Sequence, residues 1–214
     1  MIGGIKIVTI LIDLSHDIIT DMPVHPYDDP VKLYQDKFLD RDGYNNFKLE
    51  IGMHAGTHID SPMHMTNIDS FINEISLEMF IGKGCLLDVR DESVIKYKEE
   101  YSSIVNENDI VILFTGYYEK YGTEEYYKEY PVVDKELADF FIDKRIKMLG
   151  MDLPSPDRYP FEIHKVLFNN DILIIENLTN LLQLLSIDNF EIIAFPLKIK
   201  AEASMARVVA RKKC

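Results

Sequence analysis

Residues 54–64 read His54-Ala55-Gly56-Thr57-His58-Ile59-Asp60-Ser61-Pro62-Met63-His64. This segment holds three of the six histidines of the chain, with an aspartate between the last two of them. Neutral imidazole and carboxylate groups are ligands that suit zinc, manganese and iron. One histidine beside an apolar strand is more often a hydrogen-bonded structural residue, but this density of ligand-type side chains predicts a metal site.

The spacing of these residues also constrains the backbone. In one extended strand, His54 and Asp60 would lie about 20 Å apart, at roughly 3.3 Å per residue, which is too far to share an ion. Gly56 provides the backbone freedom for a turn, and Thr57 can cap one. A helical turn would bring side chains four positions apart to within about 6 Å of each other. We therefore expect the strand that ends at Met53 to deliver the histidines into a turn.

A second pair of ligand-type residues lies far downstream. His164 stands among polar and apolar residues, and Glu176 ends the apolar run at residues 172–175. A carboxylate at the end of a buried strand is costly unless it is paired or bound to a metal. It can also simply reach water, so this pair is a candidate for the metal site only because the motif at residues 54–64 precedes it.

The overall composition predicts one folded domain over residues 1–214. The chain is 47% hydrophobic and 28% charged, which is ordinary for a globular protein. Its formal net charge of −13 disfavours nucleic-acid partners. No apolar run approaches the ~18 residues that span a bilayer, and the first residues lack a signal-peptide pattern. With two cysteines, Cys85 and Cys214, and no disulfide framework, we expect a cytoplasmic protein without a membrane partner.

The hydrophobic pattern predicts a mixed α/β domain with the order of the sheet left open. Residues 46–53 alternate between apolar and polar side chains, which is typical of a half-buried strand. Residues 135–146 have helical spacing, with Asp134 as the N-cap, and the prolines of residues 21–32 indicate a loop. Further strands are expected at residues 5–12, 83–89, 109–115, 147–151, 171–176, 190–199 and 206–211.

The pattern His54-x-Gly-Thr-His58-x-Asp60-x-Pro62-x-His64 resembles the signature of the cyclase-like metal-dependent hydrolases, a family that includes bacterial kynurenine formamidase and isatin hydrolase. The resemblance covers nearly the whole chain. It implies an α/β fold with a swivelling β/β/α core, commonly assembled into homodimers or homotetramers. The other segments that carry it are Ile12-Asp13-Leu14-Ser15, Phe114-Thr115-Gly116, Gly150-Met151-Asp152-Leu153-Pro154-Ser155-Pro156-Asp157, His164 with Glu176-Asn177-Leu178, Pro196-Leu197-Lys198-Ile199 and Ala206-Arg207.

The resemblance implies a centre of two divalent metal ions. His54, His58 and Asp60 would bind the first ion. Asp60 would bridge to a second ion held by His164, and Glu176 would help to hold both. The resemblance implies zinc or manganese, and a ligand set that mixes imidazole and carboxylate groups suits either. Two such ions and two carboxylates leave a net positive charge that can stabilise a developing oxyanion.

The resemblance also implies the reaction. A metal-activated water would attack an amide carbonyl, and His64, as general acid/base, would pass a proton to the leaving nitrogen. The expected small-molecule substrate is an aryl formamide, first of all N-formylkynurenine, which yields kynurenine and formate in tryptophan catabolism. A cyclic amide such as isatin, or a lactone or ester, is the alternative. An alternative of another class is a non-catalytic metal-binding protein on the same fold.

One loop departs from the family pattern. In Met22-Pro23-Val24-His25-Pro26-Tyr27-Asp28, His25 and Tyr27 stand where the family commonly has tryptophan and glycine, and this chain has no tryptophan. An aromatic wall for the substrate would then come from His25, from Tyr27 or from another aromatic residue such as Phe38 or Tyr44. We expect His25 and Tyr27 to be the substrate-binding residues.

Overall fold

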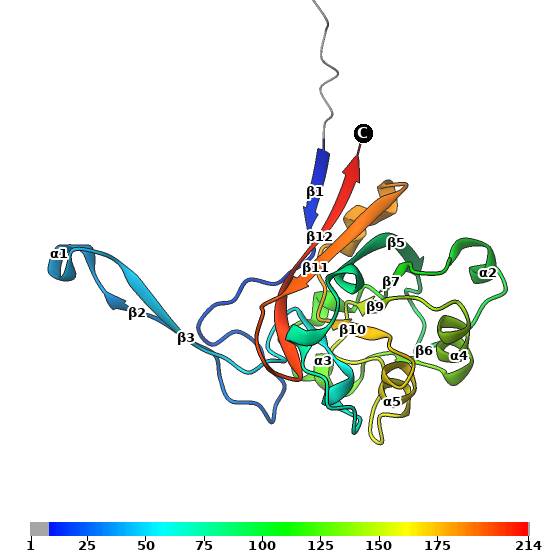
Figure 1. The fold of residues 1–214 in the computed structure, drawn as a ribbon, viewed down its shortest axis with the longest axis horizontal. Coiled ribbons are helices and arrows are strands. Elements are labelled where there is room, and N and C mark those ends of the chain that lie inside the picture. Colours follow the sequence, from blue (N-terminus) through cyan, green and yellow to red (C-terminus); the bar gives the residue numbers. More distant parts are fainter. Residues whose placement is uncertain (1–8, 214) are drawn as a thin grey trace, which may run out of the picture.

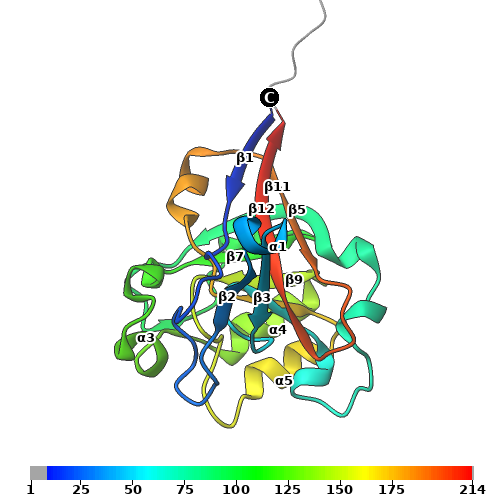
Figure 2. The same cartoon turned by 90° about the vertical axis from the view of Figure 1, so that its left-hand side faces the viewer.

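The main sheet is organised by its longest strand, β12 (Ala203–Lys213), in the computed structural model, which describes residues 9–213. The start of β12 pairs with β4 (His58–Asp60), its middle with β11 (Phe190–Pro196) and its end with β1 (Thr9–Asp13), all antiparallel. The two ends of the described chain therefore lie side by side, as Figures 1 and 2 both show.

Parallel strands complete this sheet. They are, in spatial order, β5 (Ile81–Asp88), β7 (Ile110–Phe114), β9 (Met148–Met151) and β10 (Leu173–Glu176). Strand β11 pairs with β5 at one side, and β10 pairs with β4 at the other. Because β4 also pairs with β12, the strands close into a barrel-like ring. This arrangement confirms the expected α/β fold with a mixed sheet.

The apolar strands are buried on both faces, which explains why their sequences do not alternate. In β7, Val111 and Leu113 pack in a core cluster with residues of α4 (Lys135–Asp143) and α5 (Glu162–Phe168). Ile110 and Ile112 point to the opposite side and join a second cluster with β11 and β12. A polar residue at any of these positions would lie without a partner in one of the two cores.

The longest helix begins at the N-cap predicted from the sequence. The Asp134 carboxylate accepts a hydrogen bond of 2.8 Å from the backbone N–H of Leu137. Within residues 9–213, no helix is long and apolar enough to cross a membrane. The remaining elements are short: α1 (Leu39–Asp42), α2 (Tyr101–Ile104), α3 (Glu124–Lys128), β6 (Val94–Ile95), β8 (Val132–Val133) and 3-10 turns at Pro62–His64, Ile72–Glu74, Leu77–Phe80, Tyr117–Lys120 and Leu181–Ser186.

The predicted strands are confirmed apart from small shifts at their ends, and residues 5–8 of the first one lie outside the described residues. The strand expected at residues 46–53 is shorter, β3 (Asn46–Glu50), and the expectation that it is half-buried is wrong. It pairs only with β2 (Lys32–Lys37), and all five of its residues are exposed.

Strands β2 and β3, with α1 at the tip, form a hairpin that projects far from the body of the molecule (Figure 1). We call residues 32–50 the arm. The register places Leu33 opposite Leu49 and Gln35 opposite Phe47, so Leu33, Phe47 and Leu49 share one face of the hairpin. Phe47 is 58% exposed and Leu49 is 47% exposed. The alternation in the sequence is therefore real, but Phe47 and Leu49 on the apolar face stay exposed, and Leu33 is half-buried.

Candidate metal centre

Strand pairing brings the ligand-type residues together. The register of β4 and β10 places His58 directly opposite Glu176. Directly opposed residues have side chains on the same face of a sheet, and Asp60, two positions along β4, shares that face. His58, Asp60 and Glu176 are each at most 6% exposed. The end of a buried strand thus places a carboxylate against the motif, as the sequence suggests.

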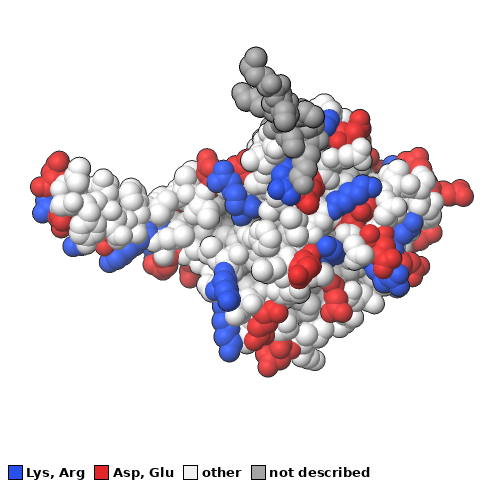
Figure 3. Space-filling view, turned by 45° about the horizontal axis from the view of Figure 1, so that its top comes forward, with Lys and Arg blue, Asp and Glu red and all other residues white. Residues whose placement is uncertain are grey.

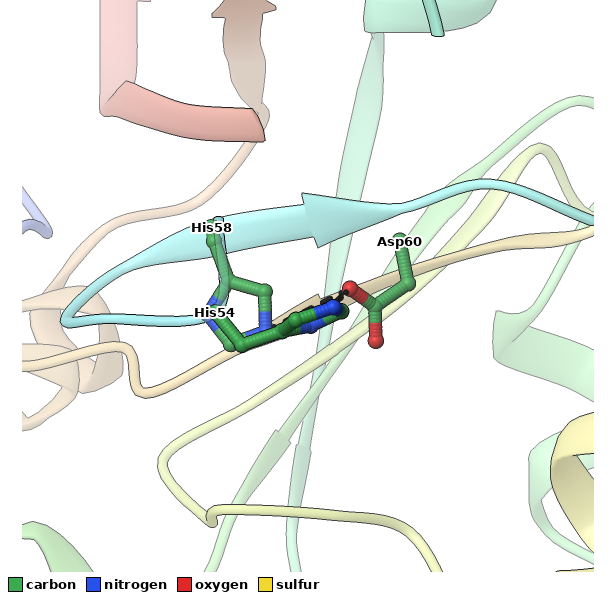
Figure 4. A group of neighbouring side chains, drawn as sticks. All are labelled: His54, His58 and Asp60. Carbon is green, nitrogen blue, oxygen red and sulfur yellow. Dashed lines mark ion pairs between the residues drawn. The ribbon is translucent and has the colours of Figure 1, made fainter. Parts of the chain in front are cut away.

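The first group of donors consists of His54, His58 and Asp60. In Figure 4, His54 comes from the turn before β4, and its ring meets the Asp60 carboxylate. Asp60 Oδ1 lies 2.9 Å from His54 Nδ1 and 3.4 Å from His58 Nε2. One carboxylate oxygen thus faces two imidazole nitrogens, and the three donor atoms lie within 4.8 Å of one another.

The second group consists of Asp60, His164 and Glu176. His164 lies on helix α5, and its Nε2 is 3.3 Å from Glu176 Oε1. The other oxygen of Glu176 is 3.3 Å from His58 Nε2. Asp60 belongs to both groups, and Glu176 faces a histidine of each. This is the arrangement of five residues expected from the sequence.

Several of these atoms are buried without a hydrogen-bond partner among residues 9–213, namely His58 Nε2 and both carboxylate oxygens of Asp60. The short contact of Asp60 with His54 has ion-pair distance but not hydrogen-bond geometry. Leaving a buried charged group without partners costs several kcal/mol. A divalent cation would satisfy all three atoms at once, and imidazole with carboxylate is the chemistry that zinc and manganese accept, so the donors fit such an ion.

The charges of the centre also favour a cation. Burial lowers the pKa of His54, but the Asp60 carboxylate outweighs burial and raises that pKa to about 9. At His164 burial is likewise outweighed, by Asp157 and Glu176, which raise its pKa to about 9. The pKa of His58 shifts in the same direction despite complete burial. Three imidazoles in this small volume are thus driven toward positive charge by the buried carboxylates.

Two histidines, His58 and His164, have a hydrogen-bond partner on Nδ1, so that Nε2 of each ring faces the centre. His58 Nδ1 lies 2.8 Å from the carbonyl oxygen of Gly56, which also accepts a hydrogen bond from the Asn177 side chain at 3.0 Å. His164 Nδ1 lies 2.5 Å from Asp157 Oδ1. A partner on one ring nitrogen fixes the tautomer and the orientation of a metal-binding histidine. Nε2 is therefore the donor atom that both rings present.

The motif folds back as its spacing requires, but not through a helical turn. Residues 53–57 form an irregular turn, and His58 to Asp60 then form strand β4. Gly56 has φ of +66°, a left-handed conformation that glycine adopts without strain. The Thr57 hydroxyl does not cap a helix; it donates a hydrogen bond of 2.6 Å to the backbone oxygen of Asn177.

A cavity of about 420 Å³ opens beside the centre, and His54, His164 and Glu176 line it. His64 lines the same cavity, with its ring centroid 4.2 Å from that of His54. Burial lowers the pKa of His64, so its imidazole is neutral at pH 7 and can accept a proton. The structure thus brings the expected acid/base residue to the five expected ligands.

The structure separates the two residues expected to bind substrate. His25 lines the cavity, whereas Tyr27 is 93% exposed and is not part of its wall. Phe38 and Tyr44 belong to the arm and do not line the cavity either. The aromatic wall consists instead of Tyr127, Tyr130, Tyr159 and Phe161.

Those four aromatic residues and Asp157 have no role in the sequence-based prediction. A signal for some of them exists, because Asp157 is the last residue of the segment Gly150–Asp157 that carries part of the family resemblance, and Tyr159 stands two positions after it. Tyr127 and Tyr130 lie in and just after the short helix α3, which no apolar periodicity marks. Only the folded chain brings that helix to the metal centre.

Acidic and basic side chains are interspersed on the face shown in Figure 3, and Lys and Arg do not gather there into a continuous patch. The chain as a whole has a net charge of −13.

Comparisons with known proteins connect this centre to a family. The chain is 29% identical to the kynurenine formamidase of Bacillus cereus over 205 residues, which are 94% of this chain and 96% of the relative. It is 28% identical to the kynurenine formamidase of Bacillus anthracis, with the same coverage of both chains.

Solved structures share the fold. Isatin hydrolase A from Labrenzia aggregata is 22% identical and superposes with a TM-score of 0.84 over 95% of this chain and 93% of the other. An isatin hydrolase bound to the product analogue thioisatinate is 18% identical, with a TM-score of 0.85 over 96% and 93%. The model of the family described as putative cyclase matches residues 12–158, which is more than half of the chain. The chain therefore belongs to the putative cyclase family.

Proposed function

We propose that this protein is a metal-dependent amide hydrolase that converts the aryl formamide N-formylkynurenine to kynurenine and formate. The observation that carries the proposal is that the neutral base His64 lines the same cavity as His54, His164 and Glu176. These three residues belong to the two groups of metal-ligand residues that share Asp60. The relatives named kynurenine formamidase, similar over nearly their whole length, support the choice of substrate.

The proposed cofactors are two divalent ions, zinc or manganese. His54, His58 and Asp60 would hold one ion, and Asp60, His164 and Glu176 the other. Bound there, such ions would lower the pKa of a coordinated water and stabilise negative charge on a carbonyl oxygen.

The residues of the chain then account for the proton movements. In the overall reaction, the water oxygen bonds to the formyl carbon, the carbon–nitrogen bond breaks, and the amine gains a proton. His64 is neutral and faces the cavity, so it accepts a proton from the attacking water and returns it to the leaving nitrogen. The aromatic residues Tyr127, Tyr130 and Phe161 provide flat apolar walls for an aryl ring.

Turnover of N-formylkynurenine by metal-free and metal-loaded protein tests the proposal. We expect activity that is lost on chelation and restored by zinc or manganese. His64→Ala should bind metal as the wild type does but lower kcat by about 10²–10⁴-fold, the usual contribution of a general acid/base.

Two outcomes would contradict this proposal. If metal-loaded protein hydrolyses isatin or an ester but no aryl formamide, the substrate is wrong and the reaction class stands. If it hydrolyses none of them, a non-catalytic metal-binding protein is the better description.

The proposed assembly is a homodimer or homotetramer, with residues 1–214 forming one domain in each subunit and the cytoplasm as its location. A two-stranded hairpin alone is only marginally stable in water, yet the arm pairs with no other described strand. The arm carries four basic and four acidic residues, so it is neutral in a chain of net charge −13 and can approach a second acidic copy without repulsion. Its apolar face, Leu33, Phe47 and Leu49, would pack against that copy.

A further inference from the structure

One arginine differs from all others in the chain. The chain has six arginines, and all of them lie in the part that the structure describes. Five form ion pairs: Arg41 with Asp42, Arg90 with Asp88, Arg145 with Glu107, Arg207 with Asp13 and Arg211 with Glu191. Among residues 9–213, no carboxylate lies within 4.0 Å of the Arg158 guanidinium. Arg158 is therefore a cation without a counter-charge in a strongly acidic protein.

Arg158 lies in the wall of the cavity that holds the metal centre. It directly follows Asp157, the residue that orients His164, so its backbone lies next to a residue that contacts the centre. Besides the histidines, the charged residues that line this cavity are Asp28, Glu176 and Arg158. Glu176 belongs to the metal centre, and Asp28 does not pair with Arg158.

The guanidinium of Arg158 is held in place by Tyr130. Its Nη2 donates a hydrogen bond to the backbone oxygen of Tyr130, and its Cζ lies over the Tyr130 ring, 4.8 Å from the centroid. Tyr130 is itself 8% exposed, and its hydroxyl donates a hydrogen bond of 2.8 Å to the backbone oxygen of Asp157. A guanidinium has five N–H donors in a planar fork, so several remain free after this contact.

A preoriented guanidinium with free donors matches a carboxylate, which it can bind through two parallel hydrogen bonds. We propose that Arg158 forms an anion subsite in the cavity and selects substrates that carry a carboxylate away from the scissile amide. This inference rests on the proposed function and deepens it: the substrate class is an aryl formamide with a negatively charged group. Arg158 is the residue that sets this specificity.

Two substrates that differ only in one carboxylate measure the effect of that negative charge. N-formylkynurenine and its carboxamide differ only in the carboxylate, and the ratio of kcat/KM for the acid to that for the carboxamide measures the preference for the anion. Arg158→Gln should lower this ratio at least about tenfold, the usual effect of losing a hydrogen bond between charged groups. Arg158→Lys should retain part of the preference, because it keeps the charge but not the fork.

Arg145→Gln is the matched control, because Arg145 is exposed, pairs with Glu107 and does not line the cavity. It removes one positive charge and should leave the ratio unchanged. If Arg158→Gln lowers kcat/KM by the same factor for both substrates, Arg158 has only a structural role and the inference is wrong.

Equilibrium binding of kynurenine and of its carboxamide tests the subsite without turnover. We expect the wild type to bind kynurenine more tightly than the carboxamide, and Arg158→Gln to lose that difference. If the wild type turns over no formamide but shows this difference in binding, the proposed function fails and the subsite stands. If the wild type binds both molecules equally, the subsite is wrong whatever the activity.

Discussion

At the scale of single residues, the centre depends on partners that do not touch the proposed ions. The Asp157 carboxylate is buried and bonds both to His164 Nδ1, at 2.5 Å, and to the backbone N–H of Ile163, at 2.6 Å. It therefore orients the His164 ring and makes its Nε2 a better metal ligand. Asp157 is a positioning residue for His164.

Replacing Asp157 with Asn keeps the size of the side chain but removes the charge. We expect Asp157→Asn to weaken metal binding by about 10–100-fold, as is usual for such partners. Competition with a chelator measures the affinity, and Asp143→Asn on the exposed end of α4 is the control. Equal affinity in Asp157→Asn and the control would show that Asp157 does not support His164.

His16 predicts a pH dependence of stability. Its ring stacks on Tyr121, with centroids 3.8 Å apart, and burial lowers its pKa from 6.5 to about 4. Between these values the unfolded chain binds a proton that the folded chain does not, so the contribution of His16 to the free energy of unfolding falls as the pH falls from 6.5 to 4. Above pH 6.5 both states are neutral and this contribution is constant.

Urea unfolding of the wild type and of His16→Gln over this range checks the sign. We expect the free energy of unfolding of the wild type to fall more steeply than that of the variant below pH 6.5, and the two to run parallel above it. The difference between the two proteins removes the effects of metal loss that both share. Parallel curves at all pH values would mean that His16 is not buried in its neutral form.

At the scale of elements, the turn before β4 sets the geometry of the centre. An alanine at position 56 would have to adopt a left-handed backbone conformation, and its Cβ would lie 2.8 Å from Met22 Cε. Gly56→Ala should therefore destabilise the fold by about 1–2 kcal/mol and weaken metal binding, since the Gly56 carbonyl holds His58. Gly52→Ala is the control, because Gly52 has no positive φ and nothing within 4 Å of its Cβ position. Similar urea midpoints for both variants would contradict this role.

Elements with a local signal could be predicted from the sequence. The apolar runs at β5, β7, β9 and β10 are strands because both of their faces are buried, and Asp134 marks the start of α4 because its side chain caps the first turn. The spacing of His54, His58 and Asp60 indicates a turn because no strand could bring them together.

The remaining features depend on long-range pairing, which leaves little local signal. The register of β4 between β10 and β12 sets Glu176 opposite His58, yet the residues of this pair lie far apart in the sequence. Tyr130 and Arg158 likewise meet only in the folded chain. Tyr27 has an aromatic side chain of the kind that binds an aryl substrate, but it is exposed to solvent and does not line the cavity.

At the scale of the whole molecule, the arm is the feature that a single chain does not explain. Its apolar face is exposed, whereas its other face carries the ion pairs Lys32–Glu50 and Lys48–Asp36. If the proposed oligomer forms through the arm, Phe47→Asp combined with Leu49→Asp should convert it to a monomer, because the new charges would lie in the proposed interface. Light scattering measures the mass, and Tyr34→Asp on the opposite face of the hairpin is the control. A wild type that is already monomeric would rule out this use of the arm.

Counting the ions per chain decides whether the centre holds two ions that share Asp60. Elemental analysis of protein purified without a histidine tag should give two zinc or manganese ions per chain, one for each donor group. His164→Ala should retain one ion, and Asp60→Asn should lose both, because Asp60 belongs to both groups. A wild type without stoichiometric divalent metal, or equal losses of metal in the two variants, would mean that the centre does not hold two ions that share Asp60.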